Sequence, residues 1–464
     1  MAVNHLYEKI NKKDTYTILM AFLICLGSCI FMNISLTVGF LGSILFSLFL
    51  LTKRGFSLCY LLKIIVDGLK ECKKLYLFIL LIGGTISVWL SSGVVPSIMY
   101  YGFEYMKGIN FLFAAYVITS FMSIFMGTAV GTISTIGIAV LGIGQGFHIP
   151  KYILLGVIVS SSFIADKLSP ISGLFNLTLS VTHTKYKQVI KAMMKTFIPT
   201  YIITGMIYYY IGANLQRGAS NIELYQSVIS NHFIISPYLL LFPILFLIFS
   251  LFEIEIIWTV LIGIFGGSMI SVFVQKITFH EVLRGIFLGY HLHSSSHEFN
   301  QIFHSGGIIS MMEVVLIVMG AIALGNLLER TGILSPMIEK ILSRIYTKKQ
   351  LVFYTGLMSS IFTIVTCDQT VGIVIPSKVF KDKYEKLEVD DTILARTISD
   401  TGTIIAPLIP WNVNALIIGA IISISPLQYG PYAVLCYLAP IITILASFKS
   451  SKGKFYYKSK GGFL

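Results

Sequence analysis

Long apolar stretches recur along the whole chain and are separated by short polar or charged segments. About 20 helical residues cross the roughly 30 Å hydrocarbon core of a bilayer, and most of these stretches approach that length. Lipid offers no partners to backbone N–H and C=O groups, so such segments are expected to be helical. The stretches cover residues 17–33, 36–51, 75–89, 111–126, 197–211, 237–251, 256–274, 314–328 and 431–448. The pattern predicts an all-α, polytopic transmembrane helical bundle with about 12 to 14 crossings.

The composition excludes a soluble protein of this size. Of the 464 residues, 55% are hydrophobic and 12% are charged, whereas roughly 25% are charged in globular domains. The formal net charge of +13 does not indicate a nucleic-acid partner, because most Lys and Arg residues lie in short loops. The chain has no G-x-x-x-x-G-K-(S/T) phosphate loop, and its six cysteines show no C-x-x-C spacing. We therefore expect no cofactor and no resident metal.

Clusters of Lys and Arg alternate with connections that hold very few such residues. The positive-inside rule places the basic loops of a membrane protein in the cytoplasm. The basic clusters lie at residues 53–74, 185–195, 340–349, 378–386 and 449–460, and the poorly charged connections at 34–35, 99–110, 214–232 and 425–430. Both termini are therefore expected to be cytoplasmic, in a multi-pass protein of the cell (plasma) membrane whose main partner is the lipid bilayer.

The chain divides into two halves of opposite expected orientation. Residues 1–213 start inside and end outside, residues 214–232 form an external linker, and residues 233–448 start outside and end inside. Residues 449–464 form a basic cytoplasmic tail. Two halves that cross the membrane in opposite senses are typical of the inverted-topology repeats of secondary transporters.

Two apolar segments in each half are interrupted by small, polar or charged residues. The interruptions are Gly127-Thr128-Ala129-Val130-Gly131-Thr132 and Asp166-Lys167-Leu168-Ser169-Pro170 with Asn176 in the first half, and Thr366-Cys367-Asp368-Gln369-Thr370 and Asp400-Thr401-Gly402-Thr403 with Pro407, Pro410 and Asn412 in the second. They fall at corresponding places in the two halves. Interrupted helices in matching positions mark the substrate site of such transporters, so we expect discontinuous helices that form an ion site here.

The residue types at the breaks suit a small cation. A proline inside a helix removes an amide donor and leaves carbonyl groups unpaired, and hydrocarbon tolerates irregular backbone only where it lines a cavity or site. Hydroxyl and amide oxygens add hard ligands. The candidate neutral ligands are Thr128, Thr132, Ser169, Asn176, Thr403 and Asn412, and the helix-breaking residues are Pro170, Pro407 and Pro410.

Asp166, Asp368 and Asp400 are the candidate ion- and proton-binding carboxylates. An Asp at the centre of a span costs about 2.5–3.5 kcal/mol on insertion scales, so three of them require a reason. Burial favours the neutral form of a carboxylate and a bound cation favours the charged form. A carboxylate balanced between these effects binds either a proton or a cation, as an antiporter requires. The alternative is a structural role, in which these residues cap helices or pair with Lys167 or Arg396.

Two further groups of polar residues have weaker functional interpretations. The tract that contains His291, His293, His297 and His304 is interpreted as an external interfacial loop, with a metal-binding or pH-sensing role as the weaker alternative. Gln301 stands where the second histidine of an H-E-x-x-H motif would be, which disfavours an intramembrane metalloprotease and any enzyme of that kind. Glu253 and Glu255 are interpreted as parts of a tight cytoplasmic turn.

Several of these pieces also resemble a known family. In the second half they are Cys367-Asp368-Gln369, Ile375-Pro376, Phe380-Lys381-Asp382, Asp400-x-Gly402-Thr403 and Pro407-Leu408-Ile409-Pro410-Trp411-Asn412, and in the first half Asp166-Lys167-Leu168-Ser169-Pro170-Ile171-Ser172 with Asn176. Over residues 15–448 the chain resembles the NhaC-type sodium/proton antiporter family. The resemblance implies exchange of Na⁺ for H⁺, which some members couple to exchange of malate and lactate. Both halves lie in one chain, so a monomer is sufficient, and a homodimer is the alternative because many transporters of this kind dimerise.

The chain departs from the pattern of this family at a few positions. The family usually has an Asp and hydroxyl residues where this chain has Gly173, Leu174 and Phe175. Ala129 and Val130 replace an aromatic and a hydroxyl residue. The loss of a carboxylate leaves an ion-coupled organic-anion exchanger of the malate/lactate type as the main alternative function. A channel or a sensor without transport is a further alternative.

Overall fold

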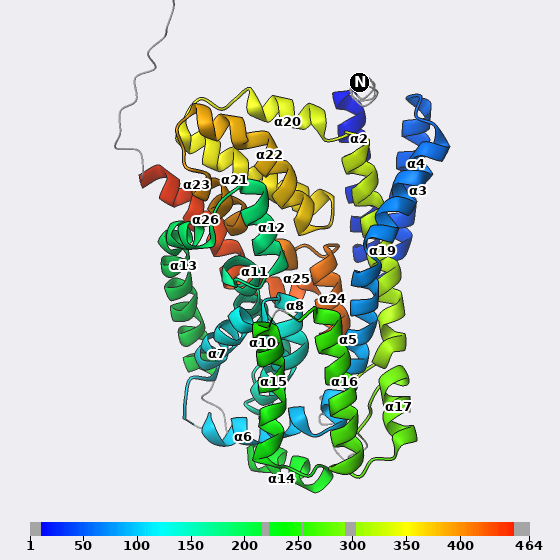
Figure 1. The fold of residues 1–464 in the computed structure, drawn as a ribbon, viewed down its shortest axis with the longest axis vertical. Helices are drawn as coiled ribbons and strands as arrows, with labels where there is room; N and C mark the ends of the chain where they lie inside the picture. Colours follow the sequence, from blue (N-terminus) through cyan, green and yellow to red (C-terminus); the bar gives the residue numbers. More distant parts are fainter. Residues whose placement is uncertain (1–10, 107, 216–221, 253, 293–302, 450–464) are drawn as a thin grey trace, which may run out of the picture.

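The computed structural model describes residues 11–106, 108–215, 222–252, 254–292 and 303–449, and over these ranges it is helical (Figure 1). The helices of the first half are α2 (Lys12–Phe31), α3 (Leu36–Lys53), α4 (Leu58–Glu71), α5 (Lys73–Ser91), α6 (Val94–Tyr105), α7 (Phe111–Met126), α8 (Ala129–Thr132), the π-helical turn η1 (Ile133–Gly137), α9 (Ile138–Gly146), α10 (Lys151–Ser162), α11 (Ala165–Leu168), α12 (Gly173–Thr182) and α13 (Tyr186–Leu215).

The chain then continues through a second series of helices. These are α14 (Ile222–His232), η2 (Pro237–Leu240), α15 (Leu241–Leu251), α16 (Ile256–Phe273), α17 (Phe279–Leu288), α19 (Gly307–Arg330), α20 (Ser335–Leu342), α21 (Lys348–Val365), α22 (Gln369–Lys386), α23 (Asp391–Ile398), η3 (Ser399–Thr403), η4 (Ala406–Leu408), α24 (Val413–Ile422), α25 (Pro426–Tyr429), η5 (Gly430–Tyr432) and α26 (Val434–Lys449). The prediction of an all-α protein with discontinuous helices is confirmed for the described residues.

Six helices of the described residues are long and apolar enough to cross a membrane, and up to nine crossings result if each of three bent helix pairs is one span. This is fewer than the 12 to 14 crossings expected from the apolar stretches. One reason is that some stretches form helices too short to count, such as Phe111–Met126. A second reason is that the interrupted segments merge neighbouring elements, so that residues 151–182 count as one span.

In the view of Figure 1, α7, α10, α15 and α16 occupy the lower part of the molecule, and α20, α22 and α23 occupy the upper part. The short elements α8, α11 and α25 lie at the level between them. Along one side, α5 packs against α19, α16 and α17. Backbones come very close there, because a Cβ on Gly83 would collide with the carbonyl group of Gly307. The arrangement brings the broken segments of both halves to the middle of the molecule.

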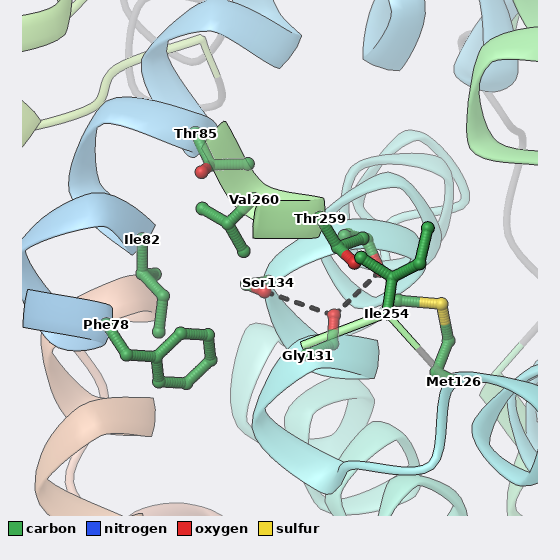
Figure 2. Close-up of a pocket in the computed structure, with 10 residues that line it drawn as sticks. Phe78, Ile82, Thr85, Met126, Gly131, Ser134, Ile254, Thr259 and Val260 are labelled. Carbon is green, nitrogen blue, oxygen red and sulfur yellow. Dashed lines mark hydrogen bonds between the residues drawn. The ribbon is translucent and has the colours of Figure 1, made fainter. Parts of the chain in front are cut away.

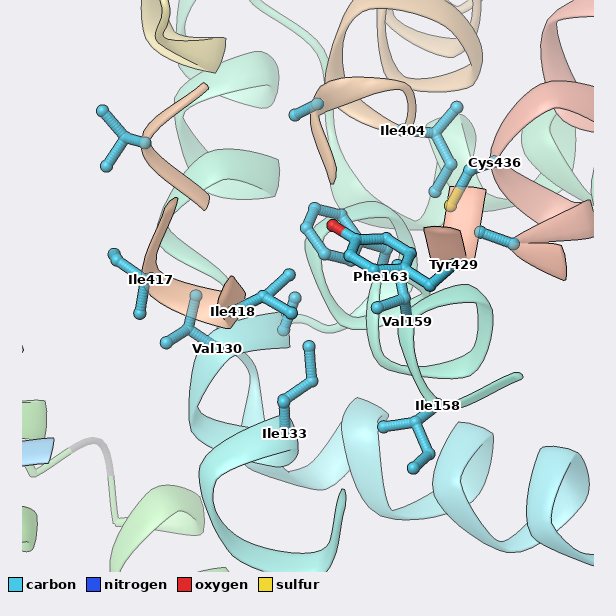
Figure 3. Packing of buried hydrophobic residues seen from close by; sticks show 14 of the residues in the cluster. Val130, Ile133, Ile158, Val159, Phe163, Ile404, Ile417, Ile418, Tyr429 and Cys436 are labelled. Carbon is cyan, nitrogen blue, oxygen red and sulfur yellow. The ribbon is translucent and has the colours of Figure 1, made fainter. Parts of the chain in front are cut away.

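A buried apolar cluster surrounds this middle level and takes residues from both halves of the chain. Val130 and Ile133 of the first half and Ile418 and Tyr429 of the second half belong to it (Figure 3). Burial of large side chains there excludes water, and the buried hydroxyl of Tyr429 is satisfied because it donates to the carbonyl of Pro407 at 2.6 Å. The polar groups at the breaks therefore lie in apolar surroundings, where electrostatic interactions are strong.

Candidate functional site

Two of the predicted helix breaks have the same backbone conformation. Gly127 ends α7 with a left-handed φ of 68°, and Thr128 is extended (φ −146°, ψ 134°) before α8 begins. Cys367 follows α21 with a φ of 62°, and Asp368 is extended (φ −135°, ψ 143°) before α22 begins. A left-handed residue followed by an extended one ends the first helix and changes the direction of the chain before the second helix begins. Thr128 and Asp368 therefore occupy equivalent positions, 240 residues apart.

The other break in each half is also built in the same way. Ser169 is extended before Pro170, and the side chain of Ser172 then caps α12. Ile409 is extended before Pro410, and the side chain of Asn412 caps α24. A residue before proline is pushed out of the helical region, which explains why both helices end there. These pairs are again 240 residues apart, so the two halves place their breaks in the same order and with the same spacing.

Each pair of breaks is held together by hydrogen bonds to equivalent carbonyl groups. In the first half, the hydroxyl of Ser169 donates to the carbonyl of Ile124. In the second half, the indole N–H of Trp411 donates to the carbonyl of Ile364 at 2.8 Å. Carbonyl groups near the end of a helix lack partners in their own helix, and a side chain from the other broken segment supplies one here. In each half, the two broken segments therefore cross each other and are joined by a hydrogen bond. We call these places the first crossing (first half) and the second crossing (second half).

Asp166 lies at the first crossing, on α11, and is buried. Its Oδ1 accepts a hydrogen bond from the hydroxyl of Ser172 at 3.4 Å, and its carboxylate lies beside the backbone amide of Ala129 at the start of α8. Asp166 forms no ion pair with any other residue of the described ranges. A buried carboxylate without a cationic side chain can be neutralised by a proton or by a metal cation.

Asp400 lies on the π-helical turn η3 and is completely buried. Its Oδ1 forms an ion pair with Lys167, a residue of the first half that is also completely buried. Its Oδ2 accepts hydrogen bonds from the hydroxyls of Thr196 on α13, at 2.6 Å, and Thr443 on α26, at 2.5 Å. Asp400 thus joins four elements of both halves. Of the two cations considered from the sequence, the structure pairs it with Lys167 and not with Arg396.

Asp368 starts α22 at the second crossing and lies beside the amides of Gln369 and Thr370. The next residue, Gln369, links the neighbouring breaks, because its Nε2 donates to the carbonyl of Thr403 and its Oε1 accepts from Nδ2 of Asn414 at 2.8 Å. This network orders the backbone around Asp368. Asp368 itself is partly exposed.

A cavity of about 420 Å³ opens beside the first crossing. Its wall contains Thr128, Pro170, Gly173 and Asn176, and Glu255 lies across from them at the start of α16. A smaller cavity of about 40 Å³ lies next to it and shares three lining residues with it. Figure 2 shows this smaller cavity between α5, α16 and the turn that holds Ser134. The larger cavity therefore reaches the broken segments at Thr128 and Pro170.

The candidate neutral ligands differ in their surroundings. Thr128 and Asn176 face the larger cavity, and Asn176 donates to the carbonyl of Pro170 at 2.9 Å. The hydroxyl of Thr132 donates within its own helix to the carbonyl of Thr128 at 2.8 Å, so it is already engaged. In the described part of the chain, the buried hydroxyl of Thr403 and Nδ2 of Asn412 have no hydrogen-bond partner.

Sequence reasoning had not identified several residues of this region. Thr196 and Thr443 lie on long apolar helices, and nothing in the sequence marks them as partners of Asp400. Glu255 was interpreted as part of a turn, and it directly precedes α16. What the sequence did not show is that it also lines the larger cavity, with Lys74 as its ion-pair partner at 2.7 Å. Glu253, the other acidic residue of that turn, lies outside the described residues.

Comparison with known proteins gives a consistent result. The model of the Na⁺/H⁺ antiporter family matches residues 163–449, which include the second break of the first half and both breaks of the second. The Na⁺/H⁺ antiporter NhaC of Bacillus subtilis (strain 168) is 29% identical over 388 residues, which cover 83% of this chain and 86% of that protein.

Other relatives are named for different exchange activities. The malate-2H⁺/Na⁺-lactate antiporter of Bacillus subtilis (strain 168) is 26% identical over 440 residues, covering 94% of this chain and 93% of that protein. The arginine/ornithine antiporter ArcD of Halobacterium salinarum (strain ATCC 700922 / JCM 11081 / NRC-1) is 26% identical over 393 residues, with coverage of 84% and 80%. All three of these relatives are antiporters, and they differ in what they exchange.

Proposed function

This chain belongs to the Na⁺/H⁺ antiporter family, and from that membership we propose that it exchanges Na⁺ for H⁺ by alternating access, with carboxylates at the broken helices as the ion-binding groups. It is a multi-pass membrane protein and a secondary transporter, not an enzyme. The observation that supports Na⁺/H⁺ exchange best is Asp166. It is a buried carboxylate at the break whose residues Thr128, Pro170 and Asn176 line the larger cavity, and it has no ion-pair partner among the described residues.

Asp166 suits the exchange of one cation for another. A carboxylate in apolar surroundings binds a proton when no cation is present, and Na⁺ with additional oxygen ligands can replace that proton. Hydroxyl groups of Thr128 and Ser172 and the backbone of the break are the nearby sources of such oxygens. Because one group cannot hold H⁺ and Na⁺ together, competition at Asp166 couples the two fluxes.

We propose that Asp368 is a second ion-binding group and that Asp400 acts in its ionised form with Lys167 as its counter-ion. The pair joins η3 of the second half to α11 of the first, only one residue from Asp166. A cation bound at Asp166 would repel the ammonium group of Lys167 and weaken its attraction to Asp400. The pair therefore provides a link by which ion binding can change how the halves pack.

We also propose that residues 1–213 and 233–448 form inverted repeats with the linker 214–232 outside and both termini, including the tail 449–464, in the cytoplasm. The equivalent break geometries of Thr128 and Asp368 support the repeat, and the distribution of Lys and Arg supports the orientation. One chain contains both pairs of breaks, so a monomer holds a complete site. Cross-linking in native membranes would test whether two copies also form a homodimer.

Proteoliposomes with a pH gradient and an internal pH-sensitive dye would test the exchanged ions. Proton movement on addition of Na⁺ or Li⁺, without a response to K⁺ or to carboxylates, is the result that the proposal expects. A response only when malate and lactate are supplied on opposite sides would replace the proposal with organic-anion exchange. Passive conductance without counterflow would indicate a channel and contradict both.

Organic-anion exchange is a second candidate because of the larger cavity. Its volume of about 420 Å³ exceeds the needs of a bare cation and falls in the range of small-molecule sites, roughly 300–1,000 Å³. The N-terminus of α12 begins at Gly173 on the cavity wall, where backbone amides favour an anionic group. Gly173 also lacks the carboxylate that the family pattern usually has there, so a carboxylate substrate meets no like charge at this position. The acidic residue of the cavity wall, Glu255, is paired with Lys74.

Replacement of Gly173 by Asp separates the two candidates. A Cβ at Gly173 would meet nothing within 4 Å, so we expect the variant to fold normally. If carboxylate exchange is the activity, the new charge repels the substrate, and the apparent affinity for malate falls by about tenfold, which corresponds to about 1.4 kcal/mol. If Na⁺/H⁺ exchange is the activity, the added ligand strengthens Na⁺ binding. Concentration dependence of both ions in proteoliposomes, with Gly173→Asn as the uncharged control, distinguishes these outcomes.

A further inference from the structure

Two histidines form a cross-strand pair in the connection between α17 and α19. The backbone amide of Ser305 donates to the carbonyl of Tyr290 at 2.9 Å, and the amide of Leu292 donates to the carbonyl of Phe303 at 3.4 Å. These bonds flank an antiparallel bridge between His291 and His304. Residues 293–302, which connect the two strands, lie outside the described part of the chain.

This pattern of hydrogen bonds places the two imidazole groups close together. The bonds run from the residues on either side of the bridge, so His291 and His304 are a non-hydrogen-bonded pair, the kind in which opposite side chains approach most closely. Their ring centroids are 4.4 Å apart. Both side chains are exposed and project from the same face of the two-stranded segment. The pair is therefore accessible to solutes and preset by the backbone.

We propose that His291 and His304 form a two-imidazole binding site for a divalent transition-metal ion such as Cu²⁺, Ni²⁺ or Zn²⁺. Imidazole nitrogens are preferred ligands of these ions. Two nitrogens on one zinc ion lie roughly 3.3 Å apart, because each Zn–N bond is about 2.0–2.1 Å long and the geometry is tetrahedral. Water or other groups complete the coordination, since the described residues contain no cluster of three or more His, Cys, Asp and Glu side chains able to hold a metal.

The site is anchored to the transporter core. The hydroxyl of Ser305, next to His304, bonds to the hydroxyl of Ser87 on α5 at 2.8 Å and accepts from the amide of Tyr290 at 2.9 Å. Two residues further on, Gly307 starts α19 and packs against Gly83 of α5. A metal ion that joins the two strands therefore also stiffens the joint between α5 and α19. We expect bound metal to raise the thermal unfolding midpoint of the whole protein.

Cu²⁺ titration of full-length protein without a polyhistidine tag tests the site. Binding is monitored by electron paramagnetic resonance and by thermal unfolding in detergent. The wild type is expected to show one site with nitrogen ligands and a Cu²⁺-dependent rise in the unfolding midpoint. In H291A and H304A, and in the milder His304→Gln, the affinity of this site falls by about tenfold or more. H232A, which removes an exposed histidine from α14, is the matched control and should bind as the wild type does.

Three results would overturn the assignment. The first is Cu²⁺ binding in the H291A/H304A double variant equal to that of the wild type. The second is loss of the site in an H293A/H297A variant while H291A and H304A keep it, which would place the ligands in the intervening segment. The third is wild-type protein with no saturable nitrogen-ligated Cu²⁺. None of these readouts depends on transport. The metal site can therefore be disproved while Na⁺/H⁺ exchange is confirmed, and Na⁺/H⁺ exchange can be disproved while the metal site is confirmed.

Discussion

Replacement of Asp400 by Asn should destabilise the protein by about 3–5 kcal/mol, because it leaves the buried ammonium group of Lys167 without its counter-charge. Coulomb attraction to a carboxylate compensates the desolvation of this ammonium group in the wild type. An amide offers only a neutral acceptor in its place. The loss of stability would appear as a lower thermal unfolding midpoint in detergent, measured by tryptophan fluorescence or circular dichroism.

The double variant Lys167→Met with Asp400→Asn tests whether the pair causes this loss. Removing both charges leaves no uncompensated buried ion, so much of the stability should return. Thr443→Val is the matched control for the hydrogen bonds on Oδ2, and it should cost about 1.5–3 kcal/mol because its partner is charged. A midpoint for Asp400→Asn equal to that of the wild type, or a double variant less stable than the single one, would contradict the buried pair.

The same variants separate structure from mechanism. A double variant that is stable but does not exchange ions would assign the charges to coupling between the halves. A double variant that is stable and exchanges ions normally would leave the pair with a purely structural role. Asp400 would then have no part in coupling the halves, and Asp166 and Asp368 would remain as the proposed ion-binding groups.

The positions of the helix breaks were predictable because each rests on local backbone chemistry. Proline at Pro170 and Pro410 forces the preceding residue out of the helix, and glycine at Gly127 accepts a left-handed φ at no steric cost. The conformation of Cys367 was not predictable in this way. A non-glycine residue rarely adopts a positive φ, and here the crossing helices impose it.

By length and composition, the described helices give six to nine candidate spans, fewer than the 12 to 14 crossings expected from the apolar stretches, for a related reason. Apolar stretches were counted as separate spans, but a stretch that ends at a break can continue into the next one through a short element such as α11. The apolar character of a segment shows that it contacts lipid or is buried in the protein core. It does not distinguish a complete membrane span from half of a broken one. Hydropathy alone therefore predicts the class of the protein better than its topology.

The composition of the site was predictable in part. An Asp between apolar residues identified Asp166, Asp368 and Asp400, since a buried charge is costly without a role. The partner of Asp400 was not predictable, because the sequence offers both Lys167 and Arg396. Only the packing of α11 against η3 selects Lys167. The hydroxyls of Thr196 and Thr443 could not be found from sequence, because threonines on apolar helices commonly bond within their own helix.

The replacement of Asp166 by Asn should abolish ion exchange while leaving the fold intact. The amide has nearly the same shape as the carboxylate, and its oxygen can still accept the hydrogen bond from Ser172. It cannot bind or release a proton in the physiological range, and it provides no negative charge for Na⁺. Exchange driven by a pH gradient in proteoliposomes should fall to the level of protein-free vesicles, with an unfolding midpoint close to that of the wild type.

Controls for Asp166→Asn make the role of its charge testable. Glu104→Gln makes the same carboxylate-to-amide change on an exposed residue of α6 and should leave exchange unchanged. Ser172→Ala removes the hydroxyl that bonds Asp166 and should weaken apparent Na⁺ affinity without abolishing exchange, because the carboxylate remains. Asp166→Glu keeps the charge but displaces it, so partial activity is expected. Wild-type rates and ion dependence in Asp166→Asn would exclude Asp166 as the group that exchanges H⁺ for Na⁺ and would direct attention to the half-buried Asp368, which lies at the equivalent crossing in the second half.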